Sequence, residues 1–107
     1  MTISEISIAE FTTIYNRGIN LVDVREADEY ESGHVAGAVN IPLSEFASRV
    51  DEIPSGVTYM ICRSGGRSMQ ACEYCVDIGK GDVVNIAGGT LGWVSAGNEV
   101  VLGGNPE

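Results

Sequence analysis

Short segments rich in β-branched residues alternate with segments of helical periodicity, and this alternation constrains the fold more than any other feature of the chain. The β-branched segments are residues 6–8, 21–24, 39–41, 57–61 and 83–86. Two neighbouring parallel strands need a crossover connection, which is usually a helix. Regular alternation of strands and helices is therefore typical of helices packed around a parallel sheet. The sequence predicts an α/β fold with five strands and about five helices.

Capping residues and glycines give the expected bounds of the first three helices. Ser7 and Glu10 have the spacing of a capping box, so a helix is expected to begin there and to end at Gly18. Residues 26–31 are mostly acidic and suit the first turns of a second helix, where we expect a solvated face. Ser44 is expected to cap a third helix. One side of this helix would carry Phe46, Ala47 and Val50.

Residues 68–78 have the clearest helical pattern in the chain. One face is apolar and contains Met69, Cys72, Cys75 and Val76. The opposite face contains Gln70, Glu73, Tyr74 and Asp77. A helix with this pattern packs its apolar face against the core and exposes the other face. Glycines at 79 and 81 are expected to end the helix before the last strand.

The size and charge of the chain limit its function. Its 107 residues fit one domain, residues 1–107, and 44% hydrophobic residues are enough for a core. The formal net charge of −9 disfavours binding to nucleic acid or to an anionic membrane. No apolar run approaches the roughly 20 residues of a membrane helix, and the first residues do not resemble a secretory leader, so we expect a cytoplasmic protein. The three cysteines are expected to be free thiols.

Cys62 follows the strongest predicted strand, residues 57–61, at its carboxyl end. Ligands of open parallel sheets bind beyond that end, so Cys62 is the leading candidate for a reactive group. The following glycines let backbone N–H groups converge, and the helix start near Ser68 adds positive potential. Arg63 and Arg67 flank the glycines and form a local anion site in an acidic protein. Such surroundings lower the pKa of a cysteine thiol and produce a nucleophilic thiolate.

The chain resembles the rhodanese superfamily in three motifs that together cover almost its whole length. The first motif consists of residues 21–26 (LVDVRE), 29–30 (EY), 33–38 (GHVAGA) and 40–42 (NIP). The second is the loop of residues 62–68 (CRSGGRS). The third joins residues 85–86 (NI) and 88–89 (GG) to Trp93, which we expect in the core. The resemblance implies a three-layer α/β/α fold around a five-stranded parallel sheet.

The same resemblance implies a sulfur-transfer reaction. Cys62 would take sulfane sulfur from a donor such as thiosulfate, hold it as a persulfide and pass it to a thiol or to cyanide. The backbone amides of residues 63–68 would stabilise the persulfide, and the two arginines would bind the anionic donor. The expected substrate-binding residues are Arg63, Ser64, Gly65, Gly66, Arg67 and Ser68. Neither a metal nor an organic cofactor is expected, and a sulfur-relay protein is an open further partner.

Two other functions stay open. Tyrosine phosphatases and arsenate reductases also place a cysteine before an arginine-bearing loop, but their loops have five residues between the two. Only four residues separate Cys62 from Arg67, so an oxyanion of the size of phosphate would fit poorly. The other alternative is a rhodanese-like module without catalytic activity, which binds a partner or regulates another domain. Such modules commonly lack the cysteine.

Several further residues have structural explanations. His34 is the single histidine, and we expect it to orient the chain before the third strand rather than to act as a base. Asp23 and Arg25 lie on the same side of a strand and are expected to form a buried ion pair. Cys72 and Cys75 form a Cys-x-x-Cys pair on the apolar side of a helix, where core packing is expected. Receipt of sulfur from the loop cysteine is the alternative for this pair.

Overall fold

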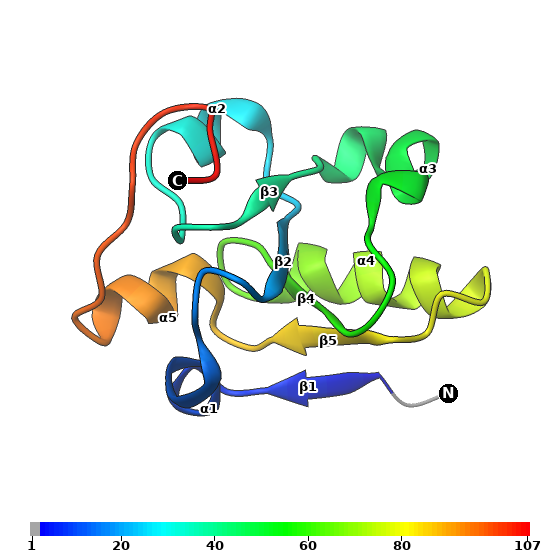
Figure 1. Cartoon of the computed structure of the whole chain (residues 1–107), viewed down its shortest axis with the longest axis horizontal. Coiled ribbons are helices and arrows are strands. Elements are labelled where there is room, and N and C mark those ends of the chain that lie inside the picture. Colours follow the sequence, from blue (N-terminus) through cyan, green and yellow to red (C-terminus); the bar gives the residue numbers. More distant parts are fainter. Residues whose placement is uncertain (1–2) are drawn as a thin grey trace.

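Five parallel strands form the sheet of the computed structural model, which describes residues 3–107 (Figure 1). The strand order is β1-β5-β4-β2-β3, and each neighbouring pair is parallel. The strands are β1 (Ser4–Ile6), β2 (Asn20–Asp23), β3 (Val39–Asn40), β4 (Thr58–Ile61) and β5 (Val83–Ile86). The predicted five-stranded parallel sheet is therefore confirmed.

Helices cover both faces of this sheet. They are α1 (Ile8–Ile14), α2 (Ala27–Glu31), α3 (Phe46–Arg49), α4 (Gly66–Asp77) and α5 (Gly89–Ser95). Successive side chains of a strand point to opposite faces, so the sheet has two apolar sides. Val22 and Met60 pack with α3 and α4, whereas Leu21 and Ile61 pack with α1, α2 and α5. Within residues 3–107, no helix has the length and apolar character needed to cross a membrane.

The first strand lies two residues earlier than predicted, at residues 4–6 and not 6–8, and the first helix is shorter than the sequence pattern predicts. Ser7 caps α1 through the expected capping box, so the following residue already belongs to the helix and β1 ends before the cap. The helix ends at Ile14 and does not reach Gly18. Tyr15 has extended backbone, and its ring packs on Trp93 at a centroid distance of 5.0 Å. The helix therefore ends where the Tyr15 ring packs against Trp93, and no further helical turn follows.

The third predicted helix is a short α-helix between two 3-10 helices, η1 (Leu43–Glu45) and η2 (Val50–Glu52). Ser44 lies inside η1 and is not a cap; its hydroxyl donates to the carboxylate of Glu26 at 2.8 Å. Phe46 and Val50 are buried as predicted, but Ala47 is exposed. A 3-10 helix has about three residues per turn, so the buried positions do not follow α-helical spacing here.

Candidate active site

Cys62 lies directly after β4, at the carboxyl edge of the sheet, and the loop that follows it leads into α4 (Figure 1). The helix begins at Gly66, slightly before the predicted start, with Gly65 as its N-cap. Gly65 has a φ of 113°, a left-handed conformation that favours glycine. In this conformation its backbone N–H donates to Sγ of Cys62 at 3.1 Å.

Further donors from the start of α4 reach the same sulfur. The Ser68 hydroxyl oxygen lies 3.3 Å from Sγ, and the amides of Ser64 and Ser68 act on it as well. Burial raises the pKa of the Cys62 thiol, but the hydroxyl and the amides together hold it below its ordinary value. The amides that act on the thiol are those of Ser64, Gly65 and Ser68, which belong to the residues 63–68 whose amides the family resemblance predicts to stabilise a persulfide. The loop favours the thiolate.

The sulfur is buried beneath the loop and is not open to solvent. Cys62 is 1% exposed, and on the core side it belongs to the same apolar cluster as Val22. On the other side, the groups that donate to the sulfur belong to the loop, in which Arg63, Ser64 and Gly66 are exposed. A layer of loop backbone therefore separates the sulfur from solvent.

The guanidinium group of Arg67 does not lie free above the sulfur. Its Nη1 and Nη2 atoms donate to the two carboxylate oxygens of Glu29 at 2.7 Å and 2.9 Å. The hydrogen bonds from Arg67 lower the pKa of Glu29 to about 2, and those to Glu29 raise the pKa of Arg67. The expectation that residues 26–31 form a purely solvated face is wrong for Glu29. Its carboxylate neutralises one of the two positive charges expected at the anion site.

Arg63 has no such partner. Its side chain is exposed and forms no ion pair with any residue between 3 and 107. Beside the loop it lines a hollow of about 280 Å³ together with the exposed side chains of Leu91 and Val94. The ion-paired side chains of Arg25 and Glu29 line the same hollow, so within residues 3–107 Arg63 is its one charged group without an ion-pair partner.

The first turn of α5 supports the loop from the neighbouring strand. The N–H groups of Thr90 and Leu91 donate to the carbonyls of Cys62 and Arg63 at 2.9 Å and 3.0 Å. A Cβ atom on Gly89 would lie 2.5 Å from the Cys62 carbonyl oxygen, so only glycine allows this approach. These bonds hold the carbonyls on α5 and leave the N–H groups of the loop to face the sulfur. None of the sequence predictions includes this support, although the glycine pair at 88–89 signals a close backbone approach.

Comparison with known proteins identifies the family. The sequence matches the rhodanese-like domain over residues 7–96. The chain belongs to the rhodanese-like family. This rhodanese-like chain is 39% identical over 82 residues to a sulfurtransferase of Allochromatium vinosum, a match that covers 76% of the chain and 77% of the relative. It is 32% identical over 104 residues to thiosulfate sulfurtransferase 18 of Arabidopsis thaliana, with 83% and 76% covered.

A solved structure agrees with this assignment. A rhodanese-related protein from Thermoplasma volcanium has the same fold with a TM-score of 0.84 at 29% sequence identity. The match covers 92% of this chain and 98% of that one. The relatives named as sulfurtransferases place the rhodanese-like chain in a sulfurtransferase family.

The first rhodanese-like motif forms a buried polar cluster beside the loop. Arg25 and Asp23 are 6% and 0% exposed and pair at 2.8 Å, which confirms the predicted contact. Arg25 also donates to the carbonyl of Gly33 at 2.8 Å. His34 is fully buried and stacks on Tyr30 at a centroid distance of 3.7 Å. The histidine thus orders the segment before β3, as predicted.

The remaining cysteines of the rhodanese-like chain lie in the core. Cys72 and Cys75 are both free and 0% exposed, on the predicted apolar face of α4. Burial raises the pKa of both thiols, in the case of Cys72 to about 12. Both side chains are therefore neutral thiols near pH 7, and the prediction of core packing is confirmed.

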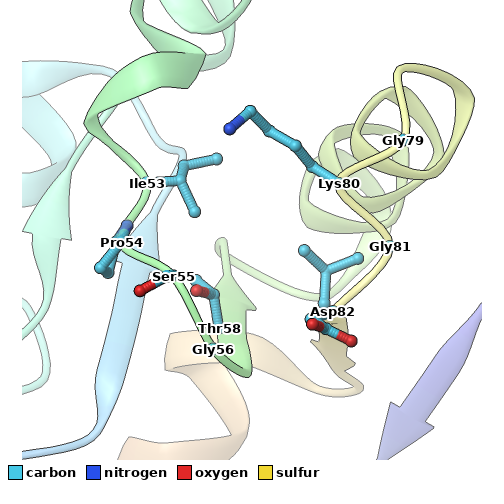
Figure 2. A pocket seen from close by; sticks show the side chains of 10 residues that line it. Ile53, Pro54, Ser55, Gly56, Thr58, Gly79, Lys80, Gly81 and Asp82 are labelled. Atoms are coloured by element: carbon cyan, nitrogen blue, oxygen red, sulfur yellow. The ribbon is translucent and has the colours of Figure 1, made fainter.

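A second hollow lies at the opposite edge of the rhodanese-like sheet. It has a volume of about 330 Å³ and lies between residues 53–56 and 79–82, where β4 and β5 begin. Figure 2 shows Lys80 extending across it toward Ile53. Because Cys62 follows the other end of β4, this hollow has no part in the site around the sulfur.

Proposed function

We propose that the chain transfers sulfane sulfur from an anionic donor to a thiophilic acceptor through a persulfide on Cys62. The position of its Sγ, 3.1 Å from the Gly65 amide nitrogen and 3.3 Å from the Ser68 hydroxyl oxygen, carries this proposal. Such donors stabilise negative charge on sulfur both before and after a second sulfur is added. The relatives named as sulfurtransferases support the reaction class.

In the first half-reaction the Cys62 thiolate attacks the outer sulfur of thiosulfate. A new S–S bond forms between Sγ and that sulfur, while the S–S bond of thiosulfate breaks and its electron pair leaves with sulfite. The enzyme then holds a Cys62 persulfide anion. The lowered pKa of Cys62 supports this step, because it increases the fraction of Cys62 that is a thiolate before the donor arrives.

In the second half-reaction a thiophilic acceptor attacks the terminal sulfur of the persulfide. Cyanide would leave as thiocyanate, and a thiolate would leave as a persulfide of its own. The Sγ–S bond breaks, and its electron pair returns to Cys62 as thiolate. The amide and hydroxyl donors that favour the thiolate also make Cys62 a good leaving group in this step.

Arg63 is the proposed binding residue for the donor. It is the loop arginine without a carboxylate partner among the described residues, and it lines the hollow beside the loop. Arg67, which the sequence also suggests as a donor ligand, would first have to leave Glu29. We therefore assign Arg67 to the structure of the loop and propose that Arg63 supplies the electrostatic attraction for the anion.

The surface beside Arg63 supports an acceptor larger than cyanide. Leu91 and Val94 are 47% and 51% exposed and line the same hollow. Apolar side chains next to a reactive loop suit the thiol of a peptide or of a sulfur-relay protein.

The three free cysteines agree with a reducing compartment, so we also propose a cytoplasmic reaction. The apolar cluster around Val22 and the one around Leu21 pack on opposite faces of the same sheet. This supports the expectation that residues 1–107 form one domain.

The alternatives have less support. A module that only binds a partner has no need of a cysteine with a lowered pKa beneath converging N–H groups. A phosphatase would need the loop arginine on the oxyanion, whereas Arg67 is paired with Glu29. Both arguments favour sulfur transfer.

Replacement of single cysteines tests the proposal. Purified wild-type protein, Cys62→Ser and Cys75→Ala should be assayed for thiocyanate formation from thiosulfate and cyanide, with circular dichroism as a check of folding. We expect Cys62→Ser to lose turnover with its fold retained, and Cys75→Ala to keep turnover. Turnover that persists in Cys62→Ser would refute the proposed nucleophile.

A further inference from the structure

The Ser68 hydroxyl group has one proton and lies among several acceptors. Its oxygen is 3.3 Å from Sγ of Cys62, 2.5 Å from Oδ1 of Asn85 and 3.2 Å from the carbonyl oxygen of Gly65. Ser68 and Asn85 are 0% and 1% exposed, so the contacts lie away from bulk water. A single hydroxyl proton cannot be donated to all of these acceptors at once. The short distance from the Ser68 oxygen to Oδ1 of Asn85 favours Asn85 as the acceptor.

The orientation of the Asn85 amide follows from its other contacts. Its Nδ2 atom donates to Oε2 of Glu5 at 2.7 Å and to the carbonyl oxygen of Gly65 at 3.3 Å. A carboxylate and a carbonyl can only accept, so the NH₂ group has to face them and Oδ1 has to face Ser68. An oxygen at that place accepts the hydroxyl proton, and Ser68 then presents a lone pair to Cys62.

We propose that Glu5 and Asn85 are positioning residues for Cys62. They keep the Ser68 O–H bond directed at Oδ1 of Asn85 while Cys62 is a thiol, and the O–H bond turns to donate to Sγ when Cys62 ionises. In the thiol state, S–H donates to Ser68 and Ser68 donates to Asn85. On ionisation the thiol proton leaves to solvent, and the Ser68 O–H bond rotates to donate to the thiolate. The rotation breaks the bond to Asn85 and changes no oxidation state.

This arrangement stabilises the thiol and limits how far the loop lowers the pKa of Cys62. An intermediate pKa of Cys62 suits a sulfur that is the nucleophile in one half-reaction and the leaving group in the other. This interpretation rests on the proposed function. Thiolate nucleophilicity falls as the thiol pKa falls, whereas leaving-group ability rises. A thiol of intermediate pKa serves both steps.

Glu5 is itself exposed, and the other charged groups near the loop have local partners or also lie at the surface. Two ion pairs occur there: Arg67 of α4 with Glu29 of α2, and Asp23 of β2 with Arg25. Cys72 on α4 is a neutral thiol, and Arg63 points to solvent. The elements β5 and α5 contribute no titratable side chain. Glu5 on β1 thus reaches the sulfur through a continuous chain of hydrogen bonds.

A double-mutant cycle tests the proposal. Glu5→Gln is made in the wild type and in Ser68→Ala, and the pKa of Cys62 is measured from the pH dependence of its alkylation by iodoacetamide. Cleavage after Arg63 and Arg67 gives a peptide that contains Cys62 alone among the cysteines, so mass analysis reports on this residue. Alkylation needs no sulfur donor, so the result stands even if the proposed sulfur transfer fails.

Glu5→Gln should lower the pKa of Cys62 by roughly half a unit to one unit in the wild-type background, because a glutamine can also donate and no longer fixes the Asn85 amide. In the Ser68→Ala background the same substitution should have almost no effect. Asp82→Asn removes one exposed negative charge at the opposite edge of the sheet and should not shift the pKa.

Two results would overturn the proposal. An equal shift in both backgrounds would mean that Glu5 acts through space as a charge and not through Ser68. No shift in either background would mean that the contact between Glu5 and Asn85 has no influence on Cys62. Asn85→Ala should also lower the pKa of Cys62. If this core variant does not fold, the double-mutant cycle of Glu5→Gln with Ser68→Ala is sufficient to test the proposal.

Discussion

Arg67 and Glu29 form a bidentate ion pair that ties the loop after Cys62 to α2, 38 residues earlier in the chain. The two side chains are 33% and 32% exposed, so the pair lies at the rim of the site and not deep inside it. The loop therefore depends on the first rhodanese-like motif for its position. This relation makes Arg67 part of the framework, so that Arg63 is the loop arginine without an ion-pair partner in the part of the chain that the structure describes.

The stability of the loop should depend on pH through Glu29. The pKa of this carboxyl is about 2 in the folded chain against an ordinary value of 4.5, so the stabilisation by the pair is complete above about pH 4.5 and is lost as the pH falls toward 2. Glu29→Gln should lower the free energy of unfolding at pH 7 by about 0.2–1 kcal/mol, as is usual for a rim pair. Urea unfolding of both proteins should show that the difference disappears near pH 2. A difference of the same size at both pH values would contradict this assignment.

Donor binding should distinguish the two loop arginines. Arg63→Ala should raise the KM for thiosulfate about tenfold, or about 1.4 kcal/mol, with a smaller change in kcat, because a binding charge is lost. Arg67→Ala should mainly lower the free energy of unfolding, since it leaves Glu29 without its partner. Arg17→Ala removes another exposed arginine and is the control for net charge. Equal effects of Arg63→Ala and Arg17→Ala on KM would show that Arg63 does not bind the donor.

Two adjacent glycines in the loop should respond differently to alanine. Gly65 has a φ of 113°, so Gly65→Ala should cost about 1–3 kcal/mol of unfolding free energy. A Cβ atom at Gly66 would have no neighbour within 4 Å, and this residue starts α4 without a positive φ, so Gly66→Ala should be neutral or stabilising. Chemical denaturation of both variants measures the difference. Similar losses would mean that the left-handed conformation at Gly65 is not what shapes the loop.

The contact between α5 and the loop should be sensitive to a single methyl group. Gly89→Ala would place Cβ 2.5 Å from the Cys62 carbonyl oxygen, so we expect a displaced loop and at least a tenfold loss of turnover. Gly97→Ala is the matched control, because Gly97 also has a positive φ, 92°, but has open space at Cβ. This control should lose some stability through backbone strain and keep its turnover. Steady-state kinetics at saturating thiosulfate would refute the idea if both variants lost activity alike.

The sequence predicts the parts of this protein that depend on local pattern. The strand of residues 83–86, the capping box at Ser7 and the apolar face that includes Cys72 all follow from spacing along one element. The position of Cys62 at the end of β4 follows from the general geometry of parallel sheets.

Contacts between distant residues could not be predicted in the same way. A sequence shows that Arg67 is basic but not that Glu29 lies within 2.7 Å of it. The same is true of Ser68 and Asn85, which are 17 residues apart and meet only because α4 and β5 are neighbours in the fold. Side-chain partners across elements depend on register and packing, which pattern alone does not determine.

The most direct test of persulfide chemistry is the mass of the protein after incubation with thiosulfate. Cleavage after Arg63 and Arg67 separates Cys62 from Cys72 and Cys75. We predict that the peptide with Cys62 gains one sulfur atom and loses it on addition of cyanide, while the peptide with the other cysteines keeps its mass. An unchanged mass of the Cys62 peptide, or a sulfur found only on the α4 peptide, would contradict sulfur transfer through Cys62.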